Sequence, residues 1–427
     1  MKKMITRWAA AILMLGSIIP LSAQQKQFEY NGINYEYLNA NTVKVVARDE
    51  NPYTGEIVIP DYVTDAGDKT KKLKVTTIGF FAFSECEITS VKFPKTLKCI
   101  ENQSFNSSAL KEVIIPYGVE TIGVSAFAQC QQLEKAVLPA TVYEIGNRTF
   151  SQCTKLSKLV LLMDHLPTRL NEKIDVFGGP EVVTSLTIYT PEKGLEAWKK
   201  FEPYGLVVTF KDVKLYTPRV NRITYEVISG SQMKLRVGDN TGLQNEAVIP
   251  EPVMLDGNEF KVTEIKDNAF LNNTSLRKVV LPASIEKLGA MAFGGCSNLL
   301  EVTSLAEVPP VCPDDAFDNN TYQNAKLYTP ADYVYTYKKA AGWCKFNKVE
   351  AAAGVGEITT DFVKVYAAEG SVVVKGVTEG MPVSVYNGLG SLVTQGYAVG
   401  EETRLDVPQQ GIYLVRVGGR CYKVLVK

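Results

Sequence analysis

Histidine is nearly missing from this sequence: the 427 residues include a single one, His165. No two cysteines form a Cys-x-x-Cys pair, so the usual zinc ligands are not grouped along the chain. The chain also has no excess of either charge, because it contains 46 basic and 46 acidic residues. It has no stripe of basic residues that could neutralise phosphates. These absences weigh against a zinc site, a nucleic-acid partner and histidine-based catalysis.

Long apolar runs are missing after the N-terminus. There, three basic residues precede an apolar run over 8–21, and Ser22 and Ala23 supply the small residues of a cleavage site. No later segment has about 18 continuous apolar residues, the length of a membrane span. We expect a signal peptide over 1–23 and an exported chain without a transmembrane segment. Without residues 1–23, the chain contains 43 basic and 46 acidic residues.

A sequence repeat of about 22 residues recurs through the first half of the chain. An isoleucine opens each copy, a phenylalanine follows five residues later, and a short β-rich run then ends in proline. A unit this short cannot bury its own apolar side, whereas stacked units bury a continuous one, so we predict a β-rich solenoid with a parallel sheet and short irregular or helical returns. The recurring residues are Ile78, Ile100, Ile122, Ile145, Phe83, Phe105, Phe127, Phe150, Pro94, Pro116 and Pro139.

The whole arrangement is duplicated. A second array contains Ile265, Phe270, Ile285 and Phe293 in the same order. A β-hairpin is predicted before each array, over 28–46 and 222–237. A segment with the sequence Tyr-Thr-Pro follows each array, and we call it the exit segment. We predict two repeat modules with hairpin caps, 24–213 and 214–350, laid end to end.

One stretch, Ile122-Gly123-x-x-Ala126-Phe127-x-x-Cys130-x-x-Leu133, resembles the BspA-like leucine-rich repeats of bacterial surface proteins. The resemblance covers about 75–162 and 262–305. It implies a curved right-handed solenoid with a parallel sheet on one face, in secreted or surface-attached proteins that bind host or bacterial macromolecules.

The chain changes character after residue 350, where we expect a separate domain over 351–427. Six short β-rich runs separated by Gly, Asn and Pro turns predict a small antiparallel β-sandwich. Its closing part, from Pro408 to Lys427, resembles the C-terminal sorting domain of type IX secretion cargo. That resemblance implies export to the outer surface of a Gram-negative bacterium, often with removal of the tail. A plain accessory β-sandwich is the alternative.

Four of the eight cysteines occupy one repeat position, three residues after the phenylalanine: Cys86, Cys130, Cys153 and Cys296. Ser108 and Asn273 take the same place in other repeats, so we predict buried free thiols, with stacked disulfides as the alternative.

Few residues suggest chemistry. His165 follows Asp164, which allows a His-Asp orienting pair, although a loop residue is the simpler interpretation. Asp314, Asp315 and Asp318 lack the alternation and closing Glu of a calcium loop and indicate a solvated turn. We expect no catalytic residue, metal or cofactor.

The outward residues of the strands remain as candidates for binding. Parallel stacking would place Ile114, Val137 and Val160 side by side as an apolar stripe edged by Lys135 and Lys158. The alternatives are that β-branched residues simply suit strands or that the exit segment covers them. We expect a secreted or surface-exposed, adhesin-like binding protein for an extracellular protein or glycan; an enzyme or accessory subunit with an unrecognised carboxylate site is the alternative.

Overall fold

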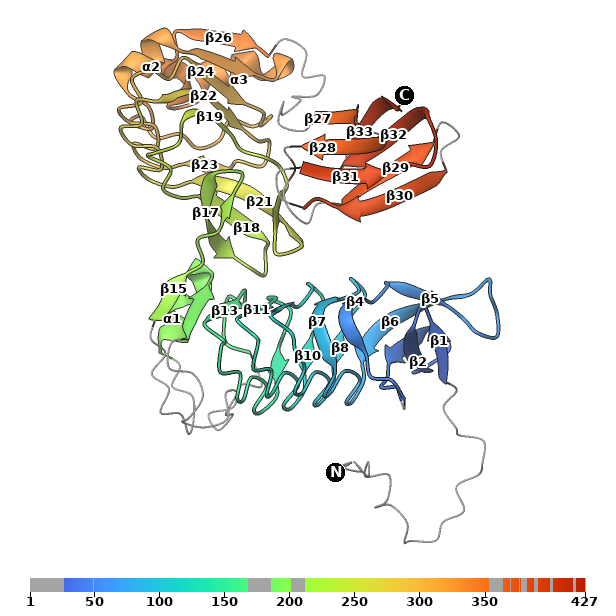
Figure 1. Ribbon diagram of the computed structural model, residues 1–427. Helices are drawn as coiled ribbons and strands as arrows, with labels where there is room; N and C mark the ends of the chain where they lie inside the picture. Colours follow the sequence, from blue (N-terminus) through green and yellow to red (C-terminus); the bar gives the residue numbers. More distant parts are fainter. Residues whose placement is uncertain are drawn as a thin grey trace, which may run out of the picture.

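Two stacks of parallel strands and a pair of antiparallel sheets make up the computed structural model of the chain (Figure 1). The structure describes residues 27–48, 50–167, 186–200, 212–352 and 364–426, the last range with short gaps at 369, 376, 378–381, 388–390, 400–401 and 418–419. The expected signal peptide, 1–23, lies outside these residues.

The first solenoid begins with an antiparallel meander. Where the sequence predicts a two-stranded hairpin over 28–46, the structure has three strands. The third strand pairs in parallel with the first repeat strand, so the meander caps the open end of the stack. This sheet contains β1 (Gln27–Tyr30), β2 (Ile33–Tyr37), β3 (Thr42–Val45), β5 (Tyr62–Thr64), β6 (Lys72–Ile78), β8 (Cys99–Ile100), β10 (Thr121–Ile122) and β12 (Glu144–Ile145).

Further parallel strands line another side of the same solenoid. One pair, β4 (Thr54–Val58) and β7 (Glu87–Lys92), precedes a five-stranded sheet. The sheet continues beyond the repeats into the exit segment, where helix α1 (Glu192–Lys199) lies between its last two strands in sequence. Its strands are β9 (Glu112–Ile114), β11 (Lys135–Leu138), β13 (Lys158–Leu161), β14 (Thr187–Thr190) and β15 (Asp212–Leu215).

The repeat phenylalanines form a continuous stack inside the solenoid. Rings of Phe83, Phe105, Phe127 and Phe150 follow one another with centroids 5.1, 5.1 and 5.8 Å apart and planes within 17° of parallel. All four side chains are fully buried. Burial of one such side chain contributes about 1.5–3 kcal/mol, so each added repeat extends the core of its neighbours.

The turns between the sheets form a hydrogen-bonded layer of their own. In each repeat, the residues three and seven after the isoleucine adopt positive φ, as Gln103 (54°) and Ser107 (58°) do. Their amides donate to the next repeat, to the carbonyls of Val124 (2.9 Å) and Ala128 (2.8 Å). A left-handed residue costs about 1–2 kcal/mol when it is not glycine, and these repeated hydrogen bonds offset that cost.

The repeat cysteines are buried free thiols, as predicted. Each of three thiols donates to the phenylalanine carbonyl of the preceding repeat: Cys130 to Phe105 (3.2 Å), Cys153 to Phe127 (3.1 Å) and Cys296 to Phe270 (3.0 Å). The thiols therefore satisfy a carbonyl in each turn while they pack in the core.

The second solenoid repeats this plan in shorter form. Its stacked rings, Phe270, Phe293 and Phe317, have centroids 5.0 and 4.9 Å apart. A three-stranded antiparallel start again replaces the hairpin predicted over 222–237. The elements are β16 (Arg219–Val220), β17 (Ile223–Ser229), β18 (Lys234–Val237), β19 (Asn245–Val248), β20 (Val253–Leu255), β21 (Asn258–Ile265), β22 (Leu276–Leu281), β23 (Lys287–Leu288), β24 (Glu301–Ser304), α2 (Asn319–Asn324), β25 (Lys326–Thr329), η1 (Ala331–Tyr333), α3 (Val334–Lys339), η2 (Trp343–Lys345) and β26 (Lys348–Ala351).

The C-terminal domain is the antiparallel sandwich that the sequence predicts, with a strand over 364–368 that the sequence pattern did not reveal. A three-stranded and a four-stranded sheet enclose a core rich in valine. The strands are β27 (Lys364–Ala368), β28 (Ser371–Lys375), β29 (Pro382–Asn387), β30 (Leu392–Tyr397), β31 (Glu402–Asp406), β32 (Gly411–Val417) and β33 (Arg420–Val426).

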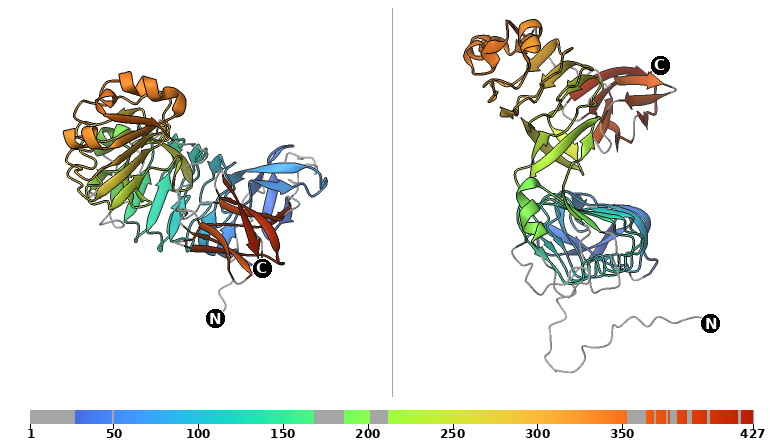
Figure 2. Two further views of the ribbon diagram at one scale, coloured as in Figure 1. Left: turned by 90° about the horizontal axis from the view of Figure 1, so that it is seen from above. Right: turned by 90° about the vertical axis from the view of Figure 1, so that its left-hand side faces the viewer.

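The three parts are not laid end to end in one line. The second solenoid rises from the β13–β15 end of the first, and the C-terminal domain lies beside it, across from β4 and β7 (Figures 1 and 2). The Lys92 ammonium of the first solenoid lies over the ring of Tyr397 in that domain.

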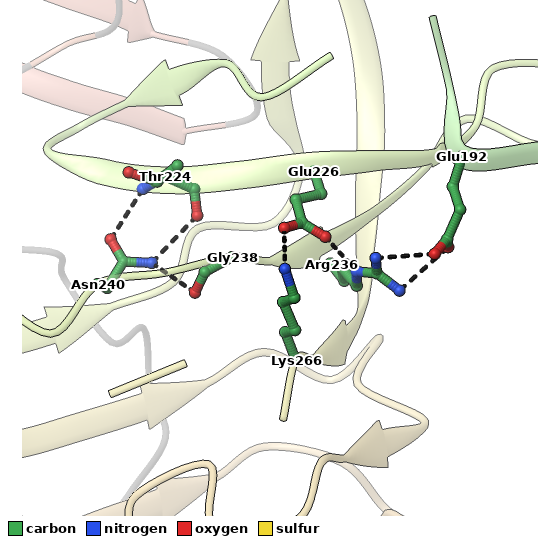
Figure 3. Close-up of polar contacts among 7 residues, drawn as sticks. All are labelled: Glu192, Thr224, Glu226, Arg236, Gly238, Asn240 and Lys266. Carbon is green, nitrogen blue, oxygen red and sulfur yellow. Dashed lines mark hydrogen bonds and ion pairs between the residues drawn. The ribbon is translucent and has the colours of Figure 1, made fainter. Parts of the chain in front are cut away.

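An ionic clamp joins the exit helix of the first solenoid to the start of the second (Figure 3). The Arg236 guanidinium binds Glu192 through both terminal nitrogens (3.0 and 2.9 Å) and Glu226 through Nε (2.6 Å). Lys266 also contacts Glu226, at 2.5 Å. The Glu226 side chain is only 6% exposed, so contacts with these two cations replace the water that it loses.

Removing the central cation should destabilise the junction. We predict that Arg236→Met lowers the free energy of unfolding by about 3 kcal/mol, the low end for a broken buried pair, because Lys266 still neutralises Glu226. Denaturant titration of the purified chain measures this loss. The control, Lys199→Met, removes an exposed pair with Glu196 and should change the value by less than about 0.5 kcal/mol. Equal losses in the two variants would contradict the clamp.

Candidate functional site

The outward residues of the first solenoid align in the columns that the sequence predicts. In the parallel register, Lys135 stands beside Lys158, and Val137 stands between Ile114 and Val160. The lysines thus form one column of the sheet and the three apolar residues form the next.

The interpretation of the apolar column as an exposed binding face is wrong, and the alternative that another segment covers it is the one that holds. Val137 and Val160 are 0% exposed and belong to the hydrophobic core of the second solenoid, against which Ile114 also packs. The same core contains Tyr216 and Leu255, so the connecting segment and the start of the second solenoid cover the column. Three β-branched side chains on one sheet face are poorly hydrated, and packing them against another apolar surface removes that cost. In this structure they are closed to a ligand.

Lys135 lies at the edge of this covered face and is already paired. Its ammonium contacts Asp256 of the second solenoid (3.2 Å) and Glu112 of the neighbouring strand (3.4 Å). Burial alone would lower the pKa of Lys135, but the two carboxylates raise it above its usual value. Asp256 also accepts a hydrogen bond from the Tyr216 hydroxyl at 2.8 Å. Lys135 therefore holds the two solenoids together.

Asp164 is a second polar link, which the sequence analysis missed. Its carboxylate accepts from the Ser229 hydroxyl (2.5 Å), the Gly230 amide (2.8 Å) and the Ser231 hydroxyl of the second solenoid. The neighbouring His165 is exposed, as expected of a loop residue, and the carboxylate serves the junction instead of orienting an imidazole.

Gly230 makes this contact sterically specific. A Cβ atom at Gly230 would lie 1.7 Å from the carbonyl oxygen of Leu162, so a larger residue would push the solenoids apart. A glycine in a Ser-Gly-Ser turn is a weak sequence signal, since such turns also serve as ordinary loops.

Beside the covered column, the junction leaves a hollow of about 470 Å³, which we call the junction pocket. Lys158 reaches into it, with its ammonium 5.1 Å from the ring centroid of Tyr189 and 5.5 Å from that of Tyr216. The two rings are 6.1 Å apart and inclined at 63°. The walls come from both solenoids and the segment between them: Lys158, Tyr189, Tyr216, Thr217, Pro218, Arg219, Leu255 and Asp256.

The acidic cluster of the second solenoid has structural partners. Asp318 caps α2, where its carboxylate accepts from the Thr321 amide at 2.7 Å, and Asp314 pairs with Lys345 at 3.4 Å. In the described part of the chain, no group of three or more His, Cys, Asp or Glu residues is placed to hold a metal ion. Those same residues contain no helix long and apolar enough to span a membrane.

Several solved structures match the chain. A leucine-rich cell surface protein of Faecalibacterium prausnitzii is 16% identical, covering 77% of this chain and 96% of its own length, with a TM-score of 0.25. The pneumococcal vaccine antigen PcpA is 16% identical, with coverages of 77% and 98% and a TM-score of 0.31. A leucine-rich-repeat protein of Bacteroides ovatus is 20% identical, with coverages of 71% and 78% and a TM-score of 0.25. No curated protein matches the chain.

Family models match both repeat regions and the C-terminal domain. A domain of unknown function matches residues 352–426, the antiparallel sandwich. The BspA-type leucine-rich-repeat region matches in six copies over residues 69–168 and 259–361, the two segments that contain the stacked phenylalanines. Over these residues the repeats of both solenoids are therefore similar to BspA-type leucine-rich repeats.

Proposed function

We propose that the protein is an exported, non-catalytic binding protein that takes an extracellular protein or glycan at the junction of its two solenoids. The observation that carries the proposal is the junction pocket, whose walls come from both solenoids and the segment between them. Repeats alone supply surface, but this hollow adds concave shape and aromatic walls, which are features of ligand sites.

The links around the pocket support the proposal because they fix its walls. The Arg236 clamp, the Asp164 contacts and the Lys135–Asp256 pair each join one solenoid to the other. A site assembled from two separate units binds well only when those units are held in place before the ligand arrives, because ordering them on binding costs affinity.

The ends of the chain support export. The basic and apolar start of the sequence has the form of a signal peptide, and the closing strands resemble a type IX sorting domain. We infer that the C-terminal domain serves delivery to the surface of a Gram-negative bacterium while the solenoids bind.

Binding can be tested with the mature chain, 24–427, on arrays of extracellular-matrix proteins and glycans. We expect at least one saturable ligand. Leu255→Glu should weaken its binding at least tenfold, because Leu255 is 6% exposed and lines the junction pocket, where the new charge would disturb the packing. The control, Leu300→Glu, changes a side chain that is 52% exposed and should bind as the unmodified chain does. A chain that binds nothing above background contradicts the function, and equal binding by both variants contradicts the site.

Export can be tested by expressing the full chain in a bacterium that has the type IX machinery. We expect the surface form to begin at Gln24 and to have a mass that lacks the C-terminal domain, whereas a chain truncated after residue 350 should remain in the periplasm. Mass spectrometry of the fractionated cells measures both. A surface form that ends at Lys427 would contradict processing of the tail, and surface delivery of the truncated chain would contradict its sorting role.

A further inference from the structure

We propose that the junction pocket binds an acidic sugar residue of a glycan, with the sugar carboxylate held by Lys158 and Arg219. This inference rests on the proposed function and extends it by naming the class of ligand.

The charges that line the pocket favour an anion. Among the described residues, neither Lys158 nor Arg219 has a carboxylate within ion-pair distance, although Arg219 donates from Nε to the Arg222 carbonyl. The carboxylate in the pocket, Asp256, is already bound by Lys135 and by the Tyr216 hydroxyl. Two cations therefore remain for a ligand, and a carboxylate that accepts from both would make charge-assisted hydrogen bonds.

Lys158 differs from its neighbour Lys135 in having no carboxylate partner among the described residues. Lys135 and Lys158 are neighbours in the same column, yet only Lys135 contacts carboxylates. Lys158 is instead directed between the rings of Tyr189 and Tyr216, where cation–π attraction positions its ammonium without neutralising it.

The remaining wall groups suit a sugar. Six of the eight wall residues carry a hydrogen-bonding side chain, and only Pro218 and Leu255 do not. Thr217 and Tyr189 can each donate or accept, whereas Asp256 and the Tyr216 hydroxyl, which already donates to Asp256, can only accept. This mixture of donors and acceptors suits sugar hydroxyls. The rings of Tyr189 and Tyr216 also line the pocket, so aromatic carbon borders the space around the Lys158 ammonium. A volume of about 470 Å³ lies within the usual range for small ligands.

An acidic peptide fits the surroundings less well. Peptides often bind sheets by adding a strand to a free edge. Here β13, which carries Lys158, is paired on both sides by β11 and β14, and β14, which carries Tyr189, is paired by β13 and β15. The pocket strands that end a sheet, β16 and β20, are only 2 and 3 residues long and offer little edge for a peptide.

Calorimetric titration of the mature chain, 24–427, with matched sugars tests the proposal. The probes are 3′-sialyllactose against lactose and trigalacturonic acid against its neutral galactose trisaccharide. We expect at least one acidic sugar to bind at least tenfold more tightly than its neutral partner. We also expect added salt to weaken that binding.

Substitution of the two cations should abolish the preference. Lys158→Met and Arg219→Met keep the apolar stem of each side chain and should each weaken the acidic sugar at least tenfold, while the neutral sugar is unaffected. Lys155→Met is the matched control, because Lys155 lies on the same repeat but contacts Gln132 and does not line the pocket. Thermal unfolding of each variant verifies that the fold is retained.

The proposal is overturned by equal binding of acidic and neutral sugars, by unchanged binding of a folded Lys158→Met chain, or by binding of a hexaglutamate peptide without any acidic sugar. If the arrays reveal other ligands that depend on Leu255 while no acidic sugar binds, the proposed function stands and this inference fails. A chain that binds neither arrays nor sugars contradicts both.

Discussion

The burial of one apolar column is the interaction on which the arrangement of the chain depends. Ile114, Val137 and Val160 face outward from a parallel sheet, where they would meet water if the first solenoid stood alone. The second solenoid covers them, and burial of each valine contributes about 1.5–3 kcal/mol. This apolar contact holds the start of the second solenoid against the sheet of the first.

Apolar contact alone does not set an angle, since it has little directional preference. The polar links around the column are directional. Asp164 accepts three hydrogen bonds from one turn, and Asp256 contacts Lys135 and accepts a hydrogen bond from Tyr216. Arg236 forms ion pairs with two glutamates. Each link has a defined geometry and connects the two solenoids or their connecting segment. The junction pocket follows from this arrangement, because the walls meet at an angle that leaves the Lys158 ammonium between two rings.

The sequence predicts the part of the fold that the repeat determines. A period of 22 residues places equal positions of successive repeats side by side, so the stacked phenylalanines, the buried thiols and the column made by Ile114, Val137 and Val160 could all be derived from spacing. The additional first strand of each cap, β1 or β16, could not be derived in this way, because it lies outside the repeats. The positive φ angles of Gln103 and Ser107 could not be predicted from the sequence either, since neither residue is glycine.

The candidate site could be predicted only in part. Lys158 was identified through its column, but its aromatic neighbour Tyr216 and the acidic Asp256 lie far along the chain, and the period carries no information about which distant segment covers a column. For the same reason, the sequence places Val137 and Val160 at the surface, although the second solenoid buries them. Contacts between modules depend on how the modules pack, and that is decided by tertiary structure.

The accessibility of the apolar column tests this account most directly. The measurement is the rate at which a thiol introduced by Val160→Cys reacts with a maleimide in the native chain, in a background where the exposed Cys344 is replaced by serine. Val124→Cys, at a side chain that is 42% exposed, provides the reference rate. The account predicts that the thiol at position 160 stays protected until the chain unfolds while the thiol at 124 reacts at once. Equal rates at the two positions in folded chains would contradict the covered junction.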